Sequence, residues 1–112
     1  MKDKISILGT EYKIYQIPSD RNPKLENNYA FCEQYAKKIV ISDFKEEQGN
    51  KMSVENFVEF EKQVIRHEII HAYFGESGLR NNSDYAENEE LVDWIAIQLP
   101  KIVKTCEELE IL

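Results

Sequence analysis

The feature that most constrains the fold is a long helical pattern between residues 54 and 74. Ser53 is the expected N-cap of this helix, Glu55 suits its first turn, and Gly75 is expected to end it. At about 100° per residue, apolar side chains fall on three flanks and leave one narrow polar stripe. The stripe consists of Lys62, Arg66 and Tyr73. Because a helix that is apolar on most sides is buried, we expect this one at the centre of the fold.

The same helix carries the only two histidines of the chain, His67 and His71, in the sequence HEIIH. Residues four apart lie on one helical face, so both imidazoles can bind one metal ion at about 2.0–2.1 Å, most naturally Zn²⁺. Manganese or nickel could occupy the same donors in vitro. Glu68 lies too far around the helix to be a third ligand on that face, but it can reach a water at the site as general base. Arg66 needs no role beyond solvation.

A carboxylate is the expected third ligand, because a catalytic zinc normally takes three protein ligands and no histidine follows His71. The segment ENEELVD, residues 87–93, offers several. On a helical wheel, Glu89 lies at the edge of the apolar stripe and Asp93 lies one turn later, whereas the other glutamates of this segment point outward. The sequence therefore predicts Glu89 as the third ligand and Asp93 as the hydrogen-bond partner of one ligating histidine.

The first half of the chain has the composition of short strands. Apolar and polar side chains alternate on either side of Gly9 along residues 4–17, which predicts a hairpin or two short strands. Residues 18–28 are predicted to form an exposed loop. A second strand pair is expected at 29–32 and 38–42.

The strand at residues 38–42 has two readings. It is either a plain core strand or an edge strand beside the active helix, where it would pair with an extended substrate. In both readings Ile39 and Ile41 face one way and Val40 faces the other.

The chain after residue 80 predicts further helices. Asp84 and Glu87 have the spacing of a capping box at the start of a helix over 85–99, which is expected to stop or bend around Pro100. A short amphipathic tail helix should follow. Trp94 is expected to point away from the site and to pack, for example against that tail.

The order of these elements predicts a single α+β domain over residues 1–112. Its small antiparallel sheet would pack on the central HExxH helix and on a second helix that carries the glutamate ligand.

Two known families share these motifs. HEIIH followed by NEELVD resembles the thermolysin-like gluzincin pattern, and ENEELVDWIAIQLP is similar to the third-ligand helix of ImmA/IrrE-type peptidases. The chain also resembles short phage- and prophage-encoded zincin-like proteins. These resemblances imply a zincin-like fold with His67, His71 and Glu89 as zinc ligands, Asp93 as the residue that orients the first histidine, and Glu68 as general base. Since ImmA/IrrE-type proteins act on transcriptional repressors, they also imply a peptide or protein substrate, such as a repressor.

The expected function is a zinc metallopeptidase that hydrolyses peptide bonds with a metal-activated water. The chain has no further histidine for a transition-state electrophile, so Tyr85, near the inward stripe, is the predicted substitute, and Tyr73 is a weaker candidate. The missing histidine favours the alternative, a non-proteolytic, zinc-stabilised regulatory or interaction module of phage origin. A third reading is a small structural protein with incidental histidines.

The composition argues against nucleic acids and membranes as binding partners. A net charge of −7 argues against direct nucleic-acid binding, which depends on Lys and Arg neutralising phosphates. No apolar run reaches the roughly 18 residues of a membrane span, and the amino terminus lacks the pattern of a secretory signal. Cys32 and Cys106 form no C-x-x-C motif and are expected to be thiols. We therefore expect a cytoplasmic protein.

Overall fold

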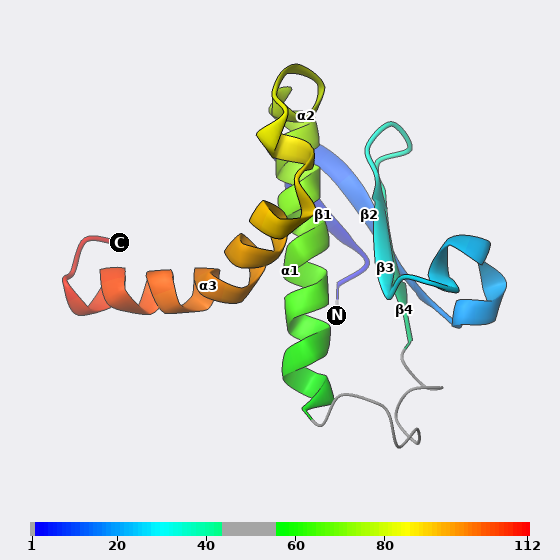
Figure 1. Cartoon of the computed structure of the whole chain (residues 1–112), viewed down its shortest axis with the longest axis horizontal. Coiled ribbons are helices and arrows are strands. Elements are labelled where there is room, and N and C mark those ends of the chain that lie inside the picture. Colours follow the sequence, from blue (N-terminus) through cyan, green and yellow to red (C-terminus); the bar gives the residue numbers. More distant parts are fainter. Residues whose placement is uncertain (1, 44–55) are drawn as a thin grey trace.

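The computed structural model describes residues 2–43 and 56–112. These residues form a four-stranded sheet, two long helices and shorter helical turns, which is an α+β arrangement. Figure 1 shows α1 standing between the sheet and α3. The strands are β1 (Lys4–Ile7), β2 (Thr10–Ile17), β3 (Ala30–Glu33) and β4 (Lys38–Ser42). The α-helices are α1 (Phe57–Glu76), α2 (Leu79–Asn82) and α3 (Glu89–Glu108), and the 3₁₀ turns are η1 (Ser19–Arg21), η2 (Pro23–Leu25) and η3 (Tyr85–Glu87).

The sheet is mixed, so the expectation of an antiparallel sheet is wrong for one pair of strands. The strand order is β1-β2-β4-β3, in which β1–β2 and β3–β4 are antiparallel but β2–β4 is parallel. Residues 18–29, which include the turns η1 and η2, connect β2 to β3 at the far edge of the sheet. The hairpin between β3 and β4 then places β4 between β2 and β3. β4 is thus an interior strand, and the edge strand beside α1 is β3. The reading of residues 38–42 as an edge strand was wrong.

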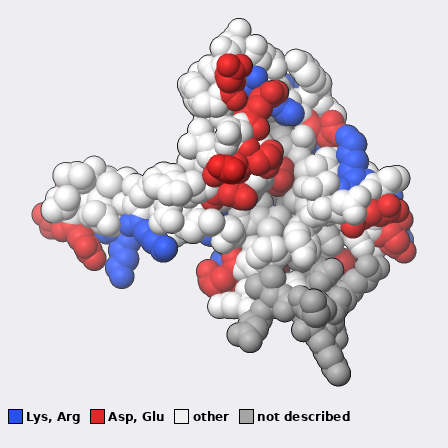
Figure 2. Space-filling model, viewed as in Figure 1, with Lys and Arg blue, Asp and Glu red and all other residues white. Residues whose placement is uncertain are grey.

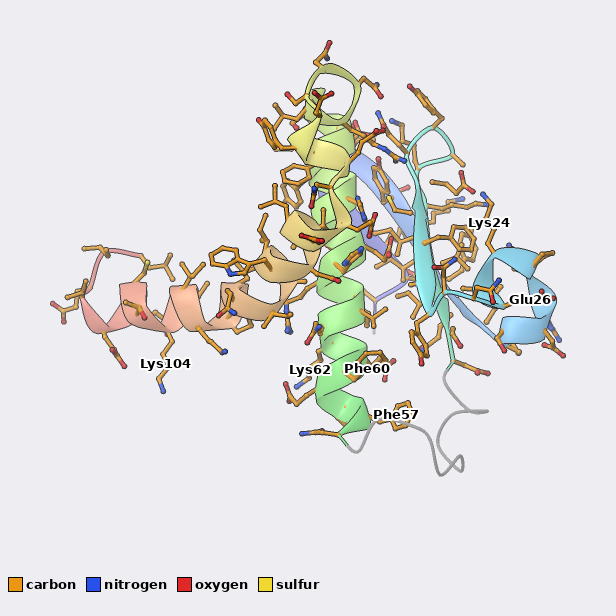
Figure 3. All side chains as sticks on the ribbon, in the orientation of Figure 1. Lys24, Glu26, Phe57, Phe60, Lys62 and Lys104 are labelled. Atoms are coloured by element: carbon orange, nitrogen blue, oxygen red, sulfur yellow. The ribbon has the colours of Figure 1, made fainter. Side chains whose placement is uncertain are left out.

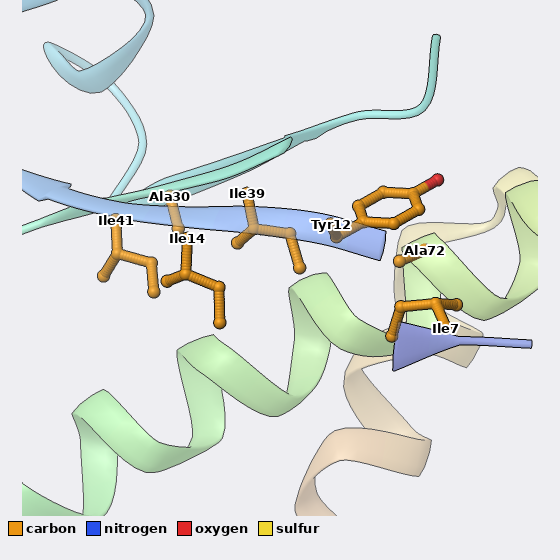
Figure 4. Packing of buried hydrophobic residues seen from close by; sticks show 7 residues of the cluster. All are labelled: Ile7, Tyr12, Ile14, Ala30, Ile39, Ile41 and Ala72. Atoms are coloured by element: carbon orange, nitrogen blue, oxygen red, sulfur yellow. The ribbon is translucent and has the colours of Figure 1, made fainter. Parts of the chain in front are cut away.

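The main core lies between the sheet and α1. Figure 4 shows side chains of β2 and β4 directed toward α1. Ile39 and Ile41, both 0% exposed, belong to this core as predicted from alternation. The buried members are Ile7, Tyr12, Ile14, Ala30, Ile39, Ile41 and Ala72. Each fully buried isoleucine stabilises the fold by about 1.5–3 kcal/mol, so the sheet holds α1 firmly in place.

A smaller core joins the opposite side of α1 to α3. Its buried residues are Ile70 of α1 and Val92 and Ala96 of α3, with Phe74 and Ile95 packed against them. Because α1 is buried against the sheet on one side and against α3 on the other, the expectation of a central helix is confirmed.

The ends of α1 differ from the expected ones. The proposed cap Ser53 lies outside the described residues, as does Glu55, and the side chain of Asn56 caps the helix by accepting a hydrogen bond from Glu59 N at 3.4 Å. Gly75 does not end the helix, which runs to Glu76; the left-handed glycine after it is Gly78, with φ of 84°.

Gly75 has a packing role instead. A Cβ at this position would lie 2.8 Å from Gln34 Cδ, and Gln34 Nε2 donates a hydrogen bond to Gly75 O at 3.0 Å. The glycine therefore marks the close approach of the chain after β3 to α1.

The start of α3 also lies later than expected. The expected capping box is not formed, because the Asp84 side chain makes no cap hydrogen bond. Instead the Asn88 side chain accepts from Leu91 N at 2.9 Å, and α3 begins at Glu89. The expected metal ligand thus occupies the first position of the helix.

α3 continues through Pro100 to Glu108, so the expected tail helix is the second half of α3. Figure 1 shows α3 changing direction along its length, as a proline inside a helix commonly causes. The Ala96 carbonyl would ordinarily accept a hydrogen bond from the N–H of residue 100, which proline lacks. Arg66 Nε donates to this carbonyl at 2.7 Å. Arg66 is thus half-buried and bonded, not merely solvated.

Trp94 is 56% exposed and does not pack against a tail helix, because that segment continues its own helix.

Within residues 2–43 and 56–112, none of the helices is both long enough and apolar enough to cross a membrane.

Candidate metal centre

The structure brings the three expected metal ligands together where α3 begins beside α1. His67 Nε2 and His71 Nε2 are 3.1 Å apart. The Glu89 carboxylate spans both rings, with Oε2 2.9 Å from His67 Nε2 and Oε1 2.9 Å from His71 Nε2. These residues form a group that could hold a metal ion, with all donor atoms within 4.8 Å of one another. Figure 2 shows acidic side chains gathered in this region of the surface.

The spacing of these donors fits a tetrahedral metal. Ligands at about 2.0–2.1 Å from a tetrahedral zinc lie roughly 3.3 Å apart. The two imidazole nitrogens are 3.1 Å apart, which is close to this value, and a different Glu89 oxygen lies 2.9 Å from each of them, so the carboxylate is within reach of both nitrogens. Two imidazoles and one carboxylate also form a usual catalytic zinc set. The residues present therefore fit zinc.

Asp93, one turn after Glu89 on α3, forms a hydrogen bond with His67. Its Oδ1 lies 2.6 Å from His67 Nδ1, as predicted from the sequence. A carboxylate can only accept a hydrogen bond here, so His67 Nδ1 carries the proton and donates the hydrogen bond. In the neutral ring this leaves the lone pair on Nε2, the atom that faces His71 and Glu89. The hydrogen bond thus selects the tautomer that could bind a metal at Nε2.

Burial favours the neutral form of His71. Its side chain is 13% exposed. Burial is the main cause that lowers the pKa of His71 below its ordinary value, and the Glu89 carboxylate opposes the shift. A ligating imidazole must be deprotonated, so a lowered pKa keeps His71 in its binding form.

Glu68 lies beside His67, His71 and Glu89, the three candidate ligands that we call the ligand cluster. It is buried, with 7% of its surface exposed. Its Oε1 is 4.0 Å from His67 Nε2. Burial raises the pKa of Glu68 to about 7; His67 opposes this shift, whereas the Glu89 carboxylate reinforces it. The chain therefore places a carboxyl group that can gain and lose a proton near neutral pH next to the expected metal position.

Two hollows adjoin the ligand cluster and share five lining residues: Asn28, Ala30, His67, Glu68 and Glu89. One, of about 320 Å³, extends past Tyr29, Phe60 and Val64. The other, of about 260 Å³, extends past Cys32, His71 and Arg80. Since α1 contributes one wall and β3 with the residues before it contributes the other, the two hollows form a groove along the edge strand, which we call the β3 groove.

Arg80 is a site residue that sequence reasoning missed. It lies on the single-turn helix α2, lines the β3 groove next to His71, and lowers the pKa values of Glu68 and His71 through its charge. A lone arginine near a turn carries no motif, and only the fold shows where it lies.

The two tyrosines considered as electrophiles lie outside the groove. Tyr85 is 53% exposed on η3, Tyr73 is 43% exposed on α1, and neither lines either hollow of the β3 groove. The geometry of the groove therefore gives the predicted electrophile role of Tyr85 no support.

In comparisons with protein-family models, curated proteins and solved structures, no match to this chain was found.

Proposed function

We propose that the protein is a zinc-dependent peptidase with a zincin-like core, in which His67, His71 and Glu89 bind the metal. The observation that carries this proposal is the meeting of two imidazole nitrogens and a carboxylate, from two helices, beside a buried carboxyl group. The hydrogen bond from His67 to Asp93 supports the same arrangement.

Zinc bound at this position would supply Lewis-acid chemistry, lowering the pKa of a water and polarising the scissile carbonyl. Glu68 would accept the proton of the attacking water and pass it to the leaving amine, forming the carboxylic acid and amine products. A pKa of about 7 suits a group that must take up and release one proton in each turnover. The β3 groove would hold the peptide.

The substrate in this proposal is a peptide or protein segment. A transcriptional repressor is the first candidate, because of the resemblance of the ligand helix to that of ImmA/IrrE-type peptidases. The net charge of −7 supports a protein rather than a nucleic-acid substrate.

The test compares wild type, Glu68→Gln and the control Glu90→Gln. Each is loaded with zinc and incubated with a repressor and with a mixed peptide library, with and without chelator, and products are identified by mass spectrometry. Glu90 is exposed on α3 and lies outside the donor group, so its variant should behave like wild type. We expect chelator-sensitive cleavage by wild type and a loss of about 100-fold or more in Glu68→Gln, with bound zinc nearly unchanged.

Two results would contradict the peptidase. One is an active Glu68→Gln protein. The other is zinc-loaded wild type that binds a partner and leaves it intact, which would support the non-proteolytic interaction module instead.

A further inference from the structure

We propose that the β3 groove selects extended peptide segments with two features: a bulky apolar side chain on the Phe60 side of the ligand cluster and an acidic side chain on the Arg80 side. This inference rests on the proposed function and names the substrate class of that site. It follows from the different chemistry of the two ends of the groove.

The wall of the groove favours an extended peptide. Within residues 2–43 and 56–112, β3 is the last strand of the sheet and pairs with β4 alone. Its residues Ala30, Phe31 and Cys32 line the hollow that also contains His67 and Glu68. The backbone groups of an edge strand can bind an added strand, and side-chain pockets then provide selectivity. A peptide along β3 would pass directly beside the ligand cluster.

The end of the groove near the start of α1 is suited to an apolar side chain. Phe60 and Val64 of α1 line it, together with Tyr29, whose ring contacts Phe60 edge to face at a centroid distance of 4.9 Å. Figure 3 shows Phe60 one turn after Phe57 on α1. The hollow of about 320 Å³ has room for a large aliphatic or aromatic side chain. Removing such a side chain from water typically improves affinity about ten-fold or more.

The opposite end of the groove carries a positive charge. Among the described residues that line the two hollows, Arg80 is the only lysine or arginine, in a chain with a net charge of −7. Its Nε lies 3.6 Å from Glu87 Oε1, but the Glu87 side chain is 63% exposed. An exposed pair of this kind is weak, and a guanidinium has five N–H donors, so Arg80 can still bind a second carboxylate.

Arg80 also offsets local negative charge. It lines the same hollow as the Glu68 and Glu89 carboxylates. Bound zinc would offset the charge of its own ligands, so Arg80 is the cationic side chain that distinguishes this end of the groove for an acidic substrate residue. The position of the arginine therefore determines where an acidic side chain can bind, which makes Arg80 a specificity residue.

The experiment measures peptide binding to the zinc-loaded Glu68→Gln protein by fluorescence anisotropy, so no turnover is needed. The probes are labelled decapeptides with one phenylalanine and, one to three residues away on either side, either glutamate or glutamine. We expect the best glutamate peptide to bind about ten-fold more tightly than its glutamine partner. Arg80→Gln should remove this preference and leave the affinity for the glutamine peptide unchanged. The control Arg21→Gln, on η1 outside the groove, should retain it.

Three results would overturn the inference: a glutamate preference that survives Arg80→Gln, an equal loss of affinity for both peptides in that variant, or the absence of binding by every peptide. Failure of the proposed function is distinguishable. If wild type binds with the charge preference but cleaves none of the peptides, the peptidase is refuted and the anionic subsite stands. If it cleaves glutamate and glutamine peptides equally, the subsite is refuted and the peptidase stands.

Discussion

Replacing Asp93 should weaken metal binding although this residue is not a ligand. Its Oδ1 accepts a hydrogen bond from His67 Nδ1–H at 2.6 Å and so keeps the lone pair of the ring on Nε2. Removing such a partner typically reduces metal affinity 10- to 100-fold, or about 1.4–2.7 kcal/mol. The Asp93 side chain is 58% exposed, so solvent screens its charge and the orienting hydrogen bond is the larger contribution.

The loss of zinc affinity should depend on which residue replaces Asp93. Asp93→Asn keeps an oxygen that can accept from His67 Nδ1, so its zinc affinity should fall by about 10-fold. Asp93→Ala leaves the ring free to adopt the other tautomer, so its loss should lie near the 100-fold end of the range. Competition with a chromogenic chelator at fixed pH measures both dissociation constants.

Glu90→Gln is the matched control for charge. It removes one negative charge from the same turns of α3, but Glu90 is not part of the donor group. Its zinc affinity should stay within about two-fold of wild type, since exposed charges interact weakly. The reasoning fails if Asp93→Ala binds zinc as tightly as wild type, or if Glu90→Gln loses as much affinity as Asp93→Ala.

Two further predictions concern the fold. Arg66→Met should lower the free energy of unfolding by about 1.5–3 kcal/mol in urea titrations, because a buried carbonyl of α3 loses its donor. The cost should be smaller in a Pro100→Ala background, which restores the missing N–H; equal costs would contradict this account. Lys37 and Tyr12 bind the Glu76 carboxylate and hold its pKa below the ordinary value. Its stabilising contribution is therefore present above the unfolded pKa and lost as pH falls through the folded pKa. Melting temperatures should fall less steeply below about pH 5 in Glu76→Gln; identical slopes would refute the assignment.

The ligand cluster could be predicted because it depends on local helical geometry. The spacing of His67 and His71 places them on one face in any regular helix, and the apolar stripe of α3 determines which glutamate turns inward. The same stripe places Asp93 one turn after Glu89, and the structure brings all four side chains together.

The ends of the helices were harder to predict because several signals compete. Gly75 looks like a helix stop in the sequence, but it is required where Gln34 approaches α1, and Gly78 occupies the left-handed position. Asp84 and Asn88 are both good caps by residue type, and only the packing of the chain before α3 decides that Asn88 is used.

The sheet topology and the second half of the groove could not be read from local patterns. Alternation identifies β4 as a strand and shows which residues face the core, but it does not reveal that β4 pairs in parallel with β2. The same long-range pairing makes β3 the edge strand, and Arg80 lines the groove from α2, a separate element after α1. Such contacts join residues far apart in sequence, where periodicity contains no information.

The most direct test of the metal centre is anomalous diffraction at the zinc absorption edge, from crystals of the full chain grown with one equivalent of zinc. We predict a single strong anomalous peak about 2.0–2.1 Å from His67 Nε2 and His71 Nε2 and within ligand distance of the Glu89 carboxylate. A peak at other residues, or none between these three side chains, would contradict the account.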